Sequence, residues 1–268
     1  MMPLFQISVI DSELSKLLSD IQAEGLLEDK LVIIGGDHGN RFTWSRRSLG
    51  GRFEERMPFM AVSLPDTVRA SQPEWQENLE QNKDKLISNF DLHLTIRKFI
   101  NSSNHPPTPP ESQRSPISVF DPIPSDRTCL EAGVPEAYCA CIPETHLPLR
   151  SPLVQQAGRT LTNKINAIIS PLRNICDSHK LSNILEARRL QSESQRVRIV
   201  IQTLHGAMYE GLLSSNGEEV VGDITRLDYA GDTVDCMERG WQQLFCYCKP
   251  EEALDQDLFD EEDKKDDK

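Results

Sequence analysis

The sequence has no long apolar run and no excess of basic residues, and these two absences exclude several classes of protein. No window approaches the roughly 18 consecutive apolar residues that a membrane-spanning helix requires. Lys and Arg number 29 against 42 Asp and Glu, which gives a net charge of -13. Nucleic-acid binding needs clustered cations to displace counterions from phosphates. We therefore expect no membrane span in this chain and no nucleic-acid partner.

Much of the negative charge lies at the C-terminus, where the sequence ends in EEALDQDLFDEEDKKDDK. Such a run cannot bury enough apolar surface to fold, so we predict an acidic disordered tail over residues 249–268. The rest of the chain is ordinary in composition. Its 268 residues and 38% hydrophobic content suffice for one sizeable domain or two small ones.

All seven cysteines lie between residues 129 and 248, and six of them form two similar groups. The pairs CAC at 139–141 and CYC at 246–248 are each preceded by one cysteine, Cys129 and Cys236, and the seventh is Cys176. Zinc clusters more often show C-x-x-C spacing, because two thiolates need that loop to reach one tetrahedral ion. Disulfides fit better and imply an extracellular or secretory compartment. A zinc-thiolate site built from the two C-x-C pairs remains the alternative.

The first hundred residues alternate helical and strand-like patterns. Apolar residues at helical spacing after an Asp-Ser cap predict an amphipathic helix over Asp11–Leu27. Leu31–Ile34 and Phe59–Leu64 are short continuous apolar runs, as expected for parallel strands covered on both faces, and Leu86–Ile100 suits another helix. This alternation predicts an α/β layer with a parallel sheet over residues 1–100.

A proline-rich segment, NSSNHPPTPPESQRSP at 101–116, cannot form regular structure and is predicted to be a linker. Beyond it we expect a small cysteine-bearing α+β region over 117–248. Its predicted parts are a helical stretch over about 154–190 with a break near Pro171 and an antiparallel meander over 196–226.

The local signal with most chemical content is IIGGDHGNR, in which Asp37 and His38 directly follow a predicted strand. Residues at the carboxyl end of a parallel strand project into the crevice where open α/β sheets bind ligands. A carboxylate beside an imidazole suits a divalent cation, so we predict Asp37 and His38 as metal ligands. The alternative is a plain turn, in which Asp37 caps the next segment and His38 is merely exposed.

Three separated motifs strengthen the metal hypothesis. GDHG, GGRFEERMPFMAVSLP and NFDLHLTIRKFI occur in this order, and together they resemble the C-terminal part of the alkaline-phosphatase and sulfatase superfamily. The chain is most similar to the domain-of-unknown-function 229 family of animal secreted or membrane-tethered proteins. SVFDPIPSDRTCLEAGVPEAYCACIP, KLSNILEARRL, VVGDITRLDYAGDTVDC and LFCYC extend this resemblance from about Asp11 to Cys248.

The resemblance implies an alkaline-phosphatase-like sheet, a divalent metal such as zinc or calcium, and an anionic phospho- or sulfo-ester substrate. Asp37 and His38 match the pair that would bind one ion of a two-metal centre. Arg56 matches an arginine before the next strand, and Glu55 is its expected partner in a structural role. No role is assigned to the arginines of the loop or to the remaining histidines: Arg41, Arg46, His93, His105, His146, His179 and His205.

Members of this superfamily take their nucleophile and remaining metal ligands from strands that precede the D-H-G strand. Only about 36 residues precede it here, and we predict no signal peptide among them. The expectation is therefore a truncated chain with no catalytic residue of its own and little or no hydrolase activity. The alternative is a non-catalytic extracellular binding module, whose cysteine-bearing half contacts an unknown protein or glycan.

Overall fold

The structure is a computed structural model that describes residues 3–40, 48–100, 115–238 and 240–250. Most of the predicted linker and the predicted acidic tail beyond residue 250 lie outside these ranges. The chain divides into two compact units, Met1–Cys141 and Ile142–Lys268, and each is described by itself. No described helix is long and apolar enough to cross a membrane.

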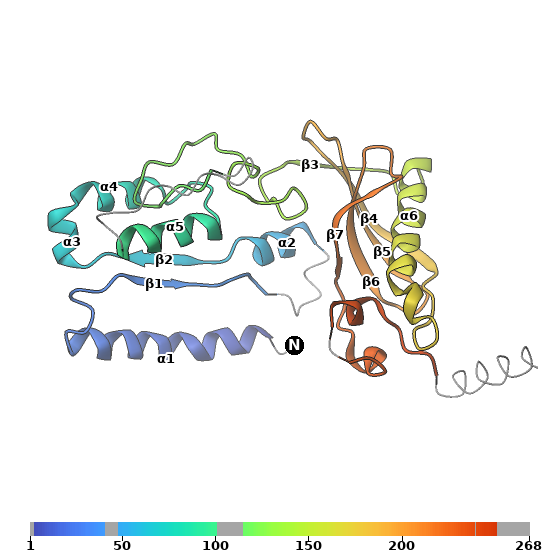
Figure 1. Cartoon of the computed structure of the whole chain (residues 1–268), viewed down its shortest axis with the longest axis horizontal. Coiled ribbons are helices and arrows are strands. Elements are labelled where there is room, and N and C mark those ends of the chain that lie inside the picture. Colours follow the sequence, from blue (N-terminus) through green and yellow to red (C-terminus); the bar gives the residue numbers. More distant parts are fainter. Residues whose placement is uncertain (1–2, 41–47, 101–114, 239, 251–268) are drawn as a thin grey trace, which may run out of the picture. The chain divides into compact units, whose positions relative to one another are not determined.

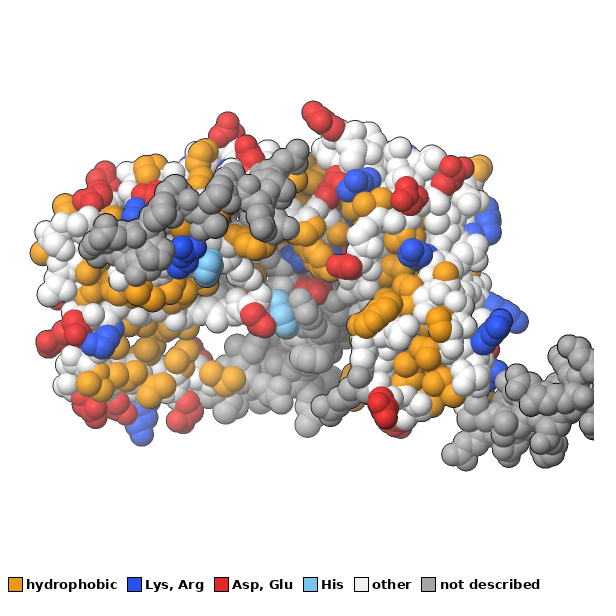
Figure 2. Space-filling view, in the orientation of Figure 1, with side chains coloured by type: hydrophobic (Ala, Val, Ile, Leu, Met, Phe, Trp, Pro, Cys, Tyr) orange, Lys and Arg blue, Asp and Glu red, His pale blue; other side chains and the backbone are white. Residues whose placement is uncertain are grey.

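The first unit combines helices with a two-stranded sheet (Figure 1). Strands β1 (Val32–Gly35) and β2 (Met60–Ser63) lie between α1 (Pro3–Ala23) on one side and α4 (Pro73–Gln81) and α5 (Asn89–Ile100) on the other. The remaining helices are α2 (Leu49–Arg56) and α3 (Asp66–Ser71). Figure 2 shows hydrophobic side chains in a line over α1 with charged side chains beside them, which confirms an amphipathic helix in this region. The predicted bounds are wrong: α1 begins at Pro3 and ends at Ala23, so Asp11 lies inside the helix and does not cap it.

The strands of this sheet run in opposite directions, contrary to the parallel arrangement expected from their apolar runs. Ile33 pairs with Val62 and Gly35 with Met60 in an antiparallel ladder. A short apolar run indicates that both faces of a strand are covered, but it does not indicate whether neighbouring strands run parallel or antiparallel. The parallel sheet is therefore not found among the described residues, whereas the mixture of helices and strands is confirmed.

The core of the first unit includes residues from beyond the proline-rich segment. Trp75 of α4 stacks on Phe120, with ring centroids 4.5 Å apart, and Leu64 and Ile123 are buried in the same cluster. The buried amide of Asn82 donates to the carbonyl oxygens of residues 119 and 121 and accepts from the Ile123 N–H. Residues 115–141 thus belong to the first unit, whereas the sequence predicted that 117–141 would fold with the second region.

A buried ion pair between Asp91 and Arg127 joins α5 to the segment after the linker. The Asp91 carboxylate, in the first turn of α5, accepts hydrogen bonds from both terminal nitrogens of Arg127 at 2.8 and 2.9 Å. It also accepts from the N–H groups of Ser88 and Ile117 at 2.7 and 2.8 Å. One carboxylate therefore caps the helix and holds the backbone at Ile117 against it.

The second unit is one helix packed on a five-stranded antiparallel sheet (Figure 1). The strand order is β3-β4-β5-β6-β7. Helix α6 spans Pro152–Ile169 and is followed by η2 (Ser170–Leu172); after the sheet come η3 (Gly231–Val234) and η4 (Trp241–Phe245). The strands are β3 (Glu144–His146), β4 (Leu181–Leu190), β5 (Val197–Thr203), β6 (Met208–Leu213) and β7 (Val220–Arg226).

The meander predicted over 196–226 is confirmed by β5, β6 and β7. The helical prediction for 154–190 is confirmed only as far as Leu172 and is wrong beyond it, because 173–180 contain no helix and 181–190 form a strand. The sequence LSNILEARRL forms β4 and pairs antiparallel with β5. Leu, Glu, Ala and Arg favour helices only weakly, by tenths of a kcal/mol each, and pairing in a buried sheet overrides that preference.

Helix and sheet meet closely at Gly211 of β6. A Cβ at this position would lie 2.7 Å from Cδ1 of Leu161, a fully buried residue of α6. Val154, Ile165 and Ile199 are also fully buried in this core. The absence of a side chain at Gly211 thus allows the helix to approach the sheet.

Three disulfides confirm the interpretation of the cysteines. Cys129 pairs with Cys139 in the first unit, and the second unit holds Cys176–Cys246 and Cys236–Cys248. Cys141 is a free and exposed thiol.

Candidate functional site

The GDHG sequence forms a tight turn directly after β1. The N–H of Gly36 donates to the Phe59 carbonyl oxygen at 3.1 Å, which is the last backbone contact of the sheet. The next residue, Asp37, accepts the His38 N–H on its Oδ1 at 2.9 Å. The sheet therefore ends where the two predicted ligands begin, and the Asp37 side chain folds back on the backbone of His38.

The turn is held against the end of α2 by Gly39. Its N–H donates to the Glu55 carbonyl oxygen at 2.8 Å. A Cβ on Gly39 would lie 1.6 Å from the carbonyl oxygen of Glu54, so only glycine permits this approach. At its other end α2 is capped by Ser48, whose Oγ accepts the Gly51 N–H at 3.1 Å. The backbone of the turn is thus joined to the end of α2 by the hydrogen bond between Gly39 and Glu55.

The two predicted ligands are placed so that they can share one cation. His38 Nδ1 lies 2.7 Å from the Gly39 carbonyl oxygen, so Nδ1 carries the proton and Nε2 keeps its lone pair. Nε2 lies 3.7 Å from Oδ2 of Asp37. Two ligands that each lie about 2.1 Å from a tetrahedral ion are about 3.4 Å apart. The side chain of Asp37 is 88% exposed and that of His38 is 34% exposed, so both donor atoms are accessible.

The remaining predicted residues do not complete a metal site in the part of the chain that the structure describes. Glu55 is buried, and Arg56 lies over the ring of Tyr138, with its Cζ 6.0 Å from the ring centroid. Such a contact suits the structural role that was predicted for this loop. His93 is exposed on α5. Arg41, Arg46 and His105 lie outside the described residues.

Groups of three possible metal ligands are found at cysteines only, within the described residues. One group is Cys129, Cys139 and Cys141, and the other is Cys236, Cys246 and Cys248. No third acidic or imidazole group within the described ranges joins Asp37 and His38. Their geometry provides two ligands, which is fewer than the three protein ligands of catalytic zinc sites.

A cluster of titratable side chains in the second unit was not found from the sequence. His179 is 2% exposed, and its Nε2 lies 2.7 Å from the Phe245 carbonyl oxygen and 3.4 Å from the Tyr209 hydroxyl. Burial lowers the pKa of His179, and burial also raises the pKa of Tyr209. His205 pairs with Asp177, with Nε2 3.1 Å from Oδ2. No motif marks these residues, because they meet only when η4 folds over α6 and the sheet.

A family model described as a protein of unknown function, DUF229, matches residues 4–185. The chain belongs to the DUF229 family. The DUF229 match covers more than half of the chain, including the GDHG turn, α5 and the first cysteine group. It ends inside β4, so VVGDITRLDYAGDTVDC and LFCYC lie beyond the matched residues. Neither a curated protein nor a solved structure matches the chain.

Proposed function

We propose that the first unit of this DUF229 chain carries part of the metal site of an extracellular phospho- or sulfo-ester hydrolase of the alkaline-phosphatase and sulfatase type. The observation that carries the proposal is the placement of Asp37 and His38 at the end of β1, with Oδ2 and Nε2 3.7 Å apart. In this proposal β1 and β2 belong to a larger sheet of the kind found in that superfamily. The three disulfides support an extracellular location.

The residues of the turn have separate tasks in the proposed site. The Gly39 carbonyl oxygen orients the imidazole and directs Nε2 outward, and Asp37 contributes a negative carboxylate oxygen. The imidazole nitrogen favours zinc over calcium, which prefers oxygen ligands. A bound divalent cation would supply positive charge to a hydroxyl nucleophile and to the anionic ester.

The described residues alone should have little or no hydrolase activity. Asp37 and His38 lack a third described ligand, and the Asp37 side chain is almost fully solvated. In this proposal the nucleophile and the opposing ligands are supplied from outside the described ranges. Without them the turn can bind a cation weakly, but it cannot align an ester for in-line attack.

Calorimetric zinc titration of a Cys141→Ser variant tests the site without interference from the free thiol. In this background the double substitution Asp37→Asn and His38→Gln should weaken zinc binding by at least about tenfold, because each side chain supplies one ligand atom. His93→Gln is the matched control, since it removes an exposed imidazole from the same unit and should change nothing. Equal zinc affinity in the parent and the double variant would overturn the proposed site.

Hydrolysis is tested separately with p-nitrophenyl phosphate and p-nitrophenyl sulfate in the presence of zinc. We expect rates no higher than those of zinc in buffer. A zinc-dependent rate that disappears in the Asp37→Asn variant would support the site and refute the predicted inactivity.

A non-catalytic extracellular binding module is the second candidate, and the exposed aromatic side chains of the second unit favour it. Tyr229 is 89% exposed and Trp241 is 64% exposed. Exposed aromatic rings are frequent anchors in recognition surfaces. A glycan or protein partner that binds here should change the fluorescence of Trp241, and Trp241→Ala should abolish the binding. Partners that bind equally well to the variant would exclude this surface.

A further inference from the structure

The first cysteine group places a free thiol next to a disulfide. The sulfur atoms of Cys129, Cys139 and Cys141 all lie within 4.8 Å of one another. Two of them form the Cys129–Cys139 disulfide, and the third belongs to the free Cys141. A thiolate attacks a disulfide sulfur directly, so this proximity puts a nucleophile beside its target within one short segment.

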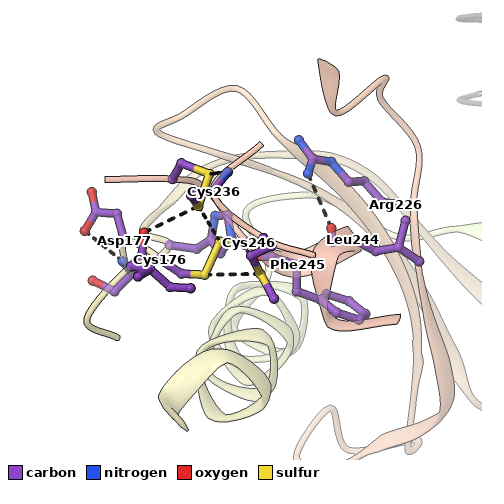
Figure 3. Close-up of a disulfide and its surroundings, with 12 residues drawn as sticks. Cys176, Asp177, Arg226, Cys236, Leu244, Phe245 and Cys246 are labelled. Carbon is purple, nitrogen blue, oxygen red and sulfur yellow. Dashed lines mark hydrogen bonds between the residues drawn. A yellow bond between two sulfur atoms is a disulfide. The ribbon is translucent and has the colours of Figure 1, made fainter. Parts of the chain in front are cut away.

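The second cysteine group has the same spacing but a different pairing. In both groups an upstream cysteine precedes the two cysteines of a C-x-C by ten and twelve residues. Cys129 is bonded to the first cysteine of its C-x-C, at a separation of 10, whereas Cys236 is bonded to the second, at a separation of 12. Cys236 Sγ nevertheless lies 3.8 Å from Sγ of the first cysteine, Cys246 (Figure 3). One spacing thus accommodates either pairing.

The two groups differ in the bonding of their third cysteine, which is the one outside the disulfide within the group. In the second group the first cysteine of the C-x-C, Cys246, is bonded to Cys176, which lies 70 residues away in the chain beside the end of α6 (Figure 3). All four sulfurs there are oxidised. In the first group Cys141 is exposed, while Cys129 and Cys139 are only 8% and 4% exposed. Solvent thiols can therefore reach the first group through Cys141 but not easily through the disulfide itself.

We propose that Cys129, Cys139 and Cys141 form a thiol–disulfide exchange site, in which Cys141 connects the buried disulfide to thiols of other molecules. In the internal step the Cys141 thiolate attacks the sulfur of Cys129. A Cys129–Cys141 bond forms, the Cys129–Cys139 bond breaks, and the Cys139 sulfur leaves as a thiolate that takes a proton from water. This step needs no oxidant or reductant, and its product has the pairing seen in the second group.

Exchange with a partner follows from the new pairing. The bond now includes the exposed Cys141 sulfur, so an incoming thiolate attacks that atom and forms a mixed disulfide with Cys141. Cys129 leaves as a thiolate, and the number of disulfide bonds is unchanged. The substrate class is a small thiol or an accessible cysteine of another polypeptide. The proposal does not depend on the metal site at Asp37 and His38.

Position-specific alkylation tests the internal step on the full chain. The folded protein is incubated at pH 8, samples are alkylated at successive times, and trypsin with a glutamate-specific protease cuts at Arg127, Glu131, Glu136 and Glu144. This digestion separates Cys129 from the peptide that holds Cys139 and Cys141. We expect early label on Cys141 and later label also on Cys139, with a Cys129–Cys141 linkage in the same samples. Label confined to Cys141 at all times would overturn the internal step.

Reduction by glutathione tests the connection to other molecules. In Cys141→Ser the Cys129–Cys139 disulfide should be reduced at least about tenfold more slowly than in the parent, because the intramolecular attack is lost. The Cys236–Cys248 disulfide is the internal control, and its reduction rate should be the same in both proteins. Equal reduction of Cys129–Cys139 in parent and variant would show direct attack on the buried disulfide and refute the proposal.

Discussion

The buried pair of Asp91 and Arg127 should be the most sensitive polar contact of the first unit. The side chain of Asp91 is 0% exposed and that of Arg127 is 2% exposed, so water cannot replace a lost partner. Asp91→Asn keeps the size of the side chain but removes the negative charge. It leaves the guanidinium of Arg127 buried without its charge partner and turns one acceptor of the Asp91 carboxylate into a donor.

The expected cost can be derived from this geometry. Breaking a buried ion pair from one side destabilises proteins by about 3–5 kcal/mol. The upper half of this range applies here, because the carboxylate of Asp91 also accepts two backbone N–H groups at 2.7 and 2.8 Å. With an m-value of about 1–3 kcal/mol/M, the urea midpoint should fall by at least about 1 M.

Urea unfolding followed by tryptophan fluorescence measures this effect. Trp75 reports the first unit, because it stacks on Phe120 in its core, and the other two tryptophans, Trp44 and Trp241, are replaced by Phe in all variants. Asp66→Asn is the matched control, since Asp66 forms an exposed pair with Arg69 on α3. That pair should contribute less than about 1 kcal/mol.

A second variant separates loss of charge from loss of packing. Adding Arg127→Met to Asp91→Asn removes the uncompensated charge and should restore part of the lost stability, because apolar replacements of buried pairs are often neutral. If Asp91→Asn shifts the urea midpoint no more than Asp66→Asn does, the reasoning about this pair is wrong.

Three further predictions concern the second unit. Gly211→Ala should lower the unfolding free energy in urea titrations by about 1–3 kcal/mol, because the new Cβ would lie 2.7 Å from Cδ1 of Leu161. An unchanged unfolding free energy would mean that α6 can shift away from the sheet without cost. The lowered pKa of His179 means that the unfolded chain binds a proton first as the pH falls below the ordinary value of 6.5. The unfolding free energy should therefore decrease below this pH by at most about 1.4 kcal/mol per pH unit, and His179→Phe should remove this pH dependence. An unchanged pH dependence in the variant would mean that other groups cause it. Replacing both cysteines of Cys176–Cys246 by Ala should lower the unfolding free energy by about 1.5 kcal/mol more than the same replacement at Cys236–Cys248. The reason is that Cys176–Cys246 closes a loop of separation 70, whereas Cys236–Cys248 closes one of separation 12. Equal shifts of the melting temperature in the two variants would contradict this loop-closure argument.

Local patterns in the sequence predicted several features correctly. The amphipathic helix near the N-terminus, the strand before the GDHG turn and the meander of the second unit follow from the spacing of apolar residues, because side chains of helices and strands repeat at fixed periods. The cysteine pattern predicted disulfides, and the order of separated motifs predicted the DUF229 family. The placement of Asp37 and His38 in one turn follows from their adjacency alone.

Long-range features were decided by the tertiary structure. The antiparallel direction of β1 and β2, the strand at 181–190 and the packing of 117–141 in the first unit depend on partners far away in the chain. The same holds for the choice of Cys139 rather than Cys141 as the partner of Cys129, because both cysteines lie within reach of it in sequence. Periodicity reports which face of an element is buried, but only packing decides which other element covers that face.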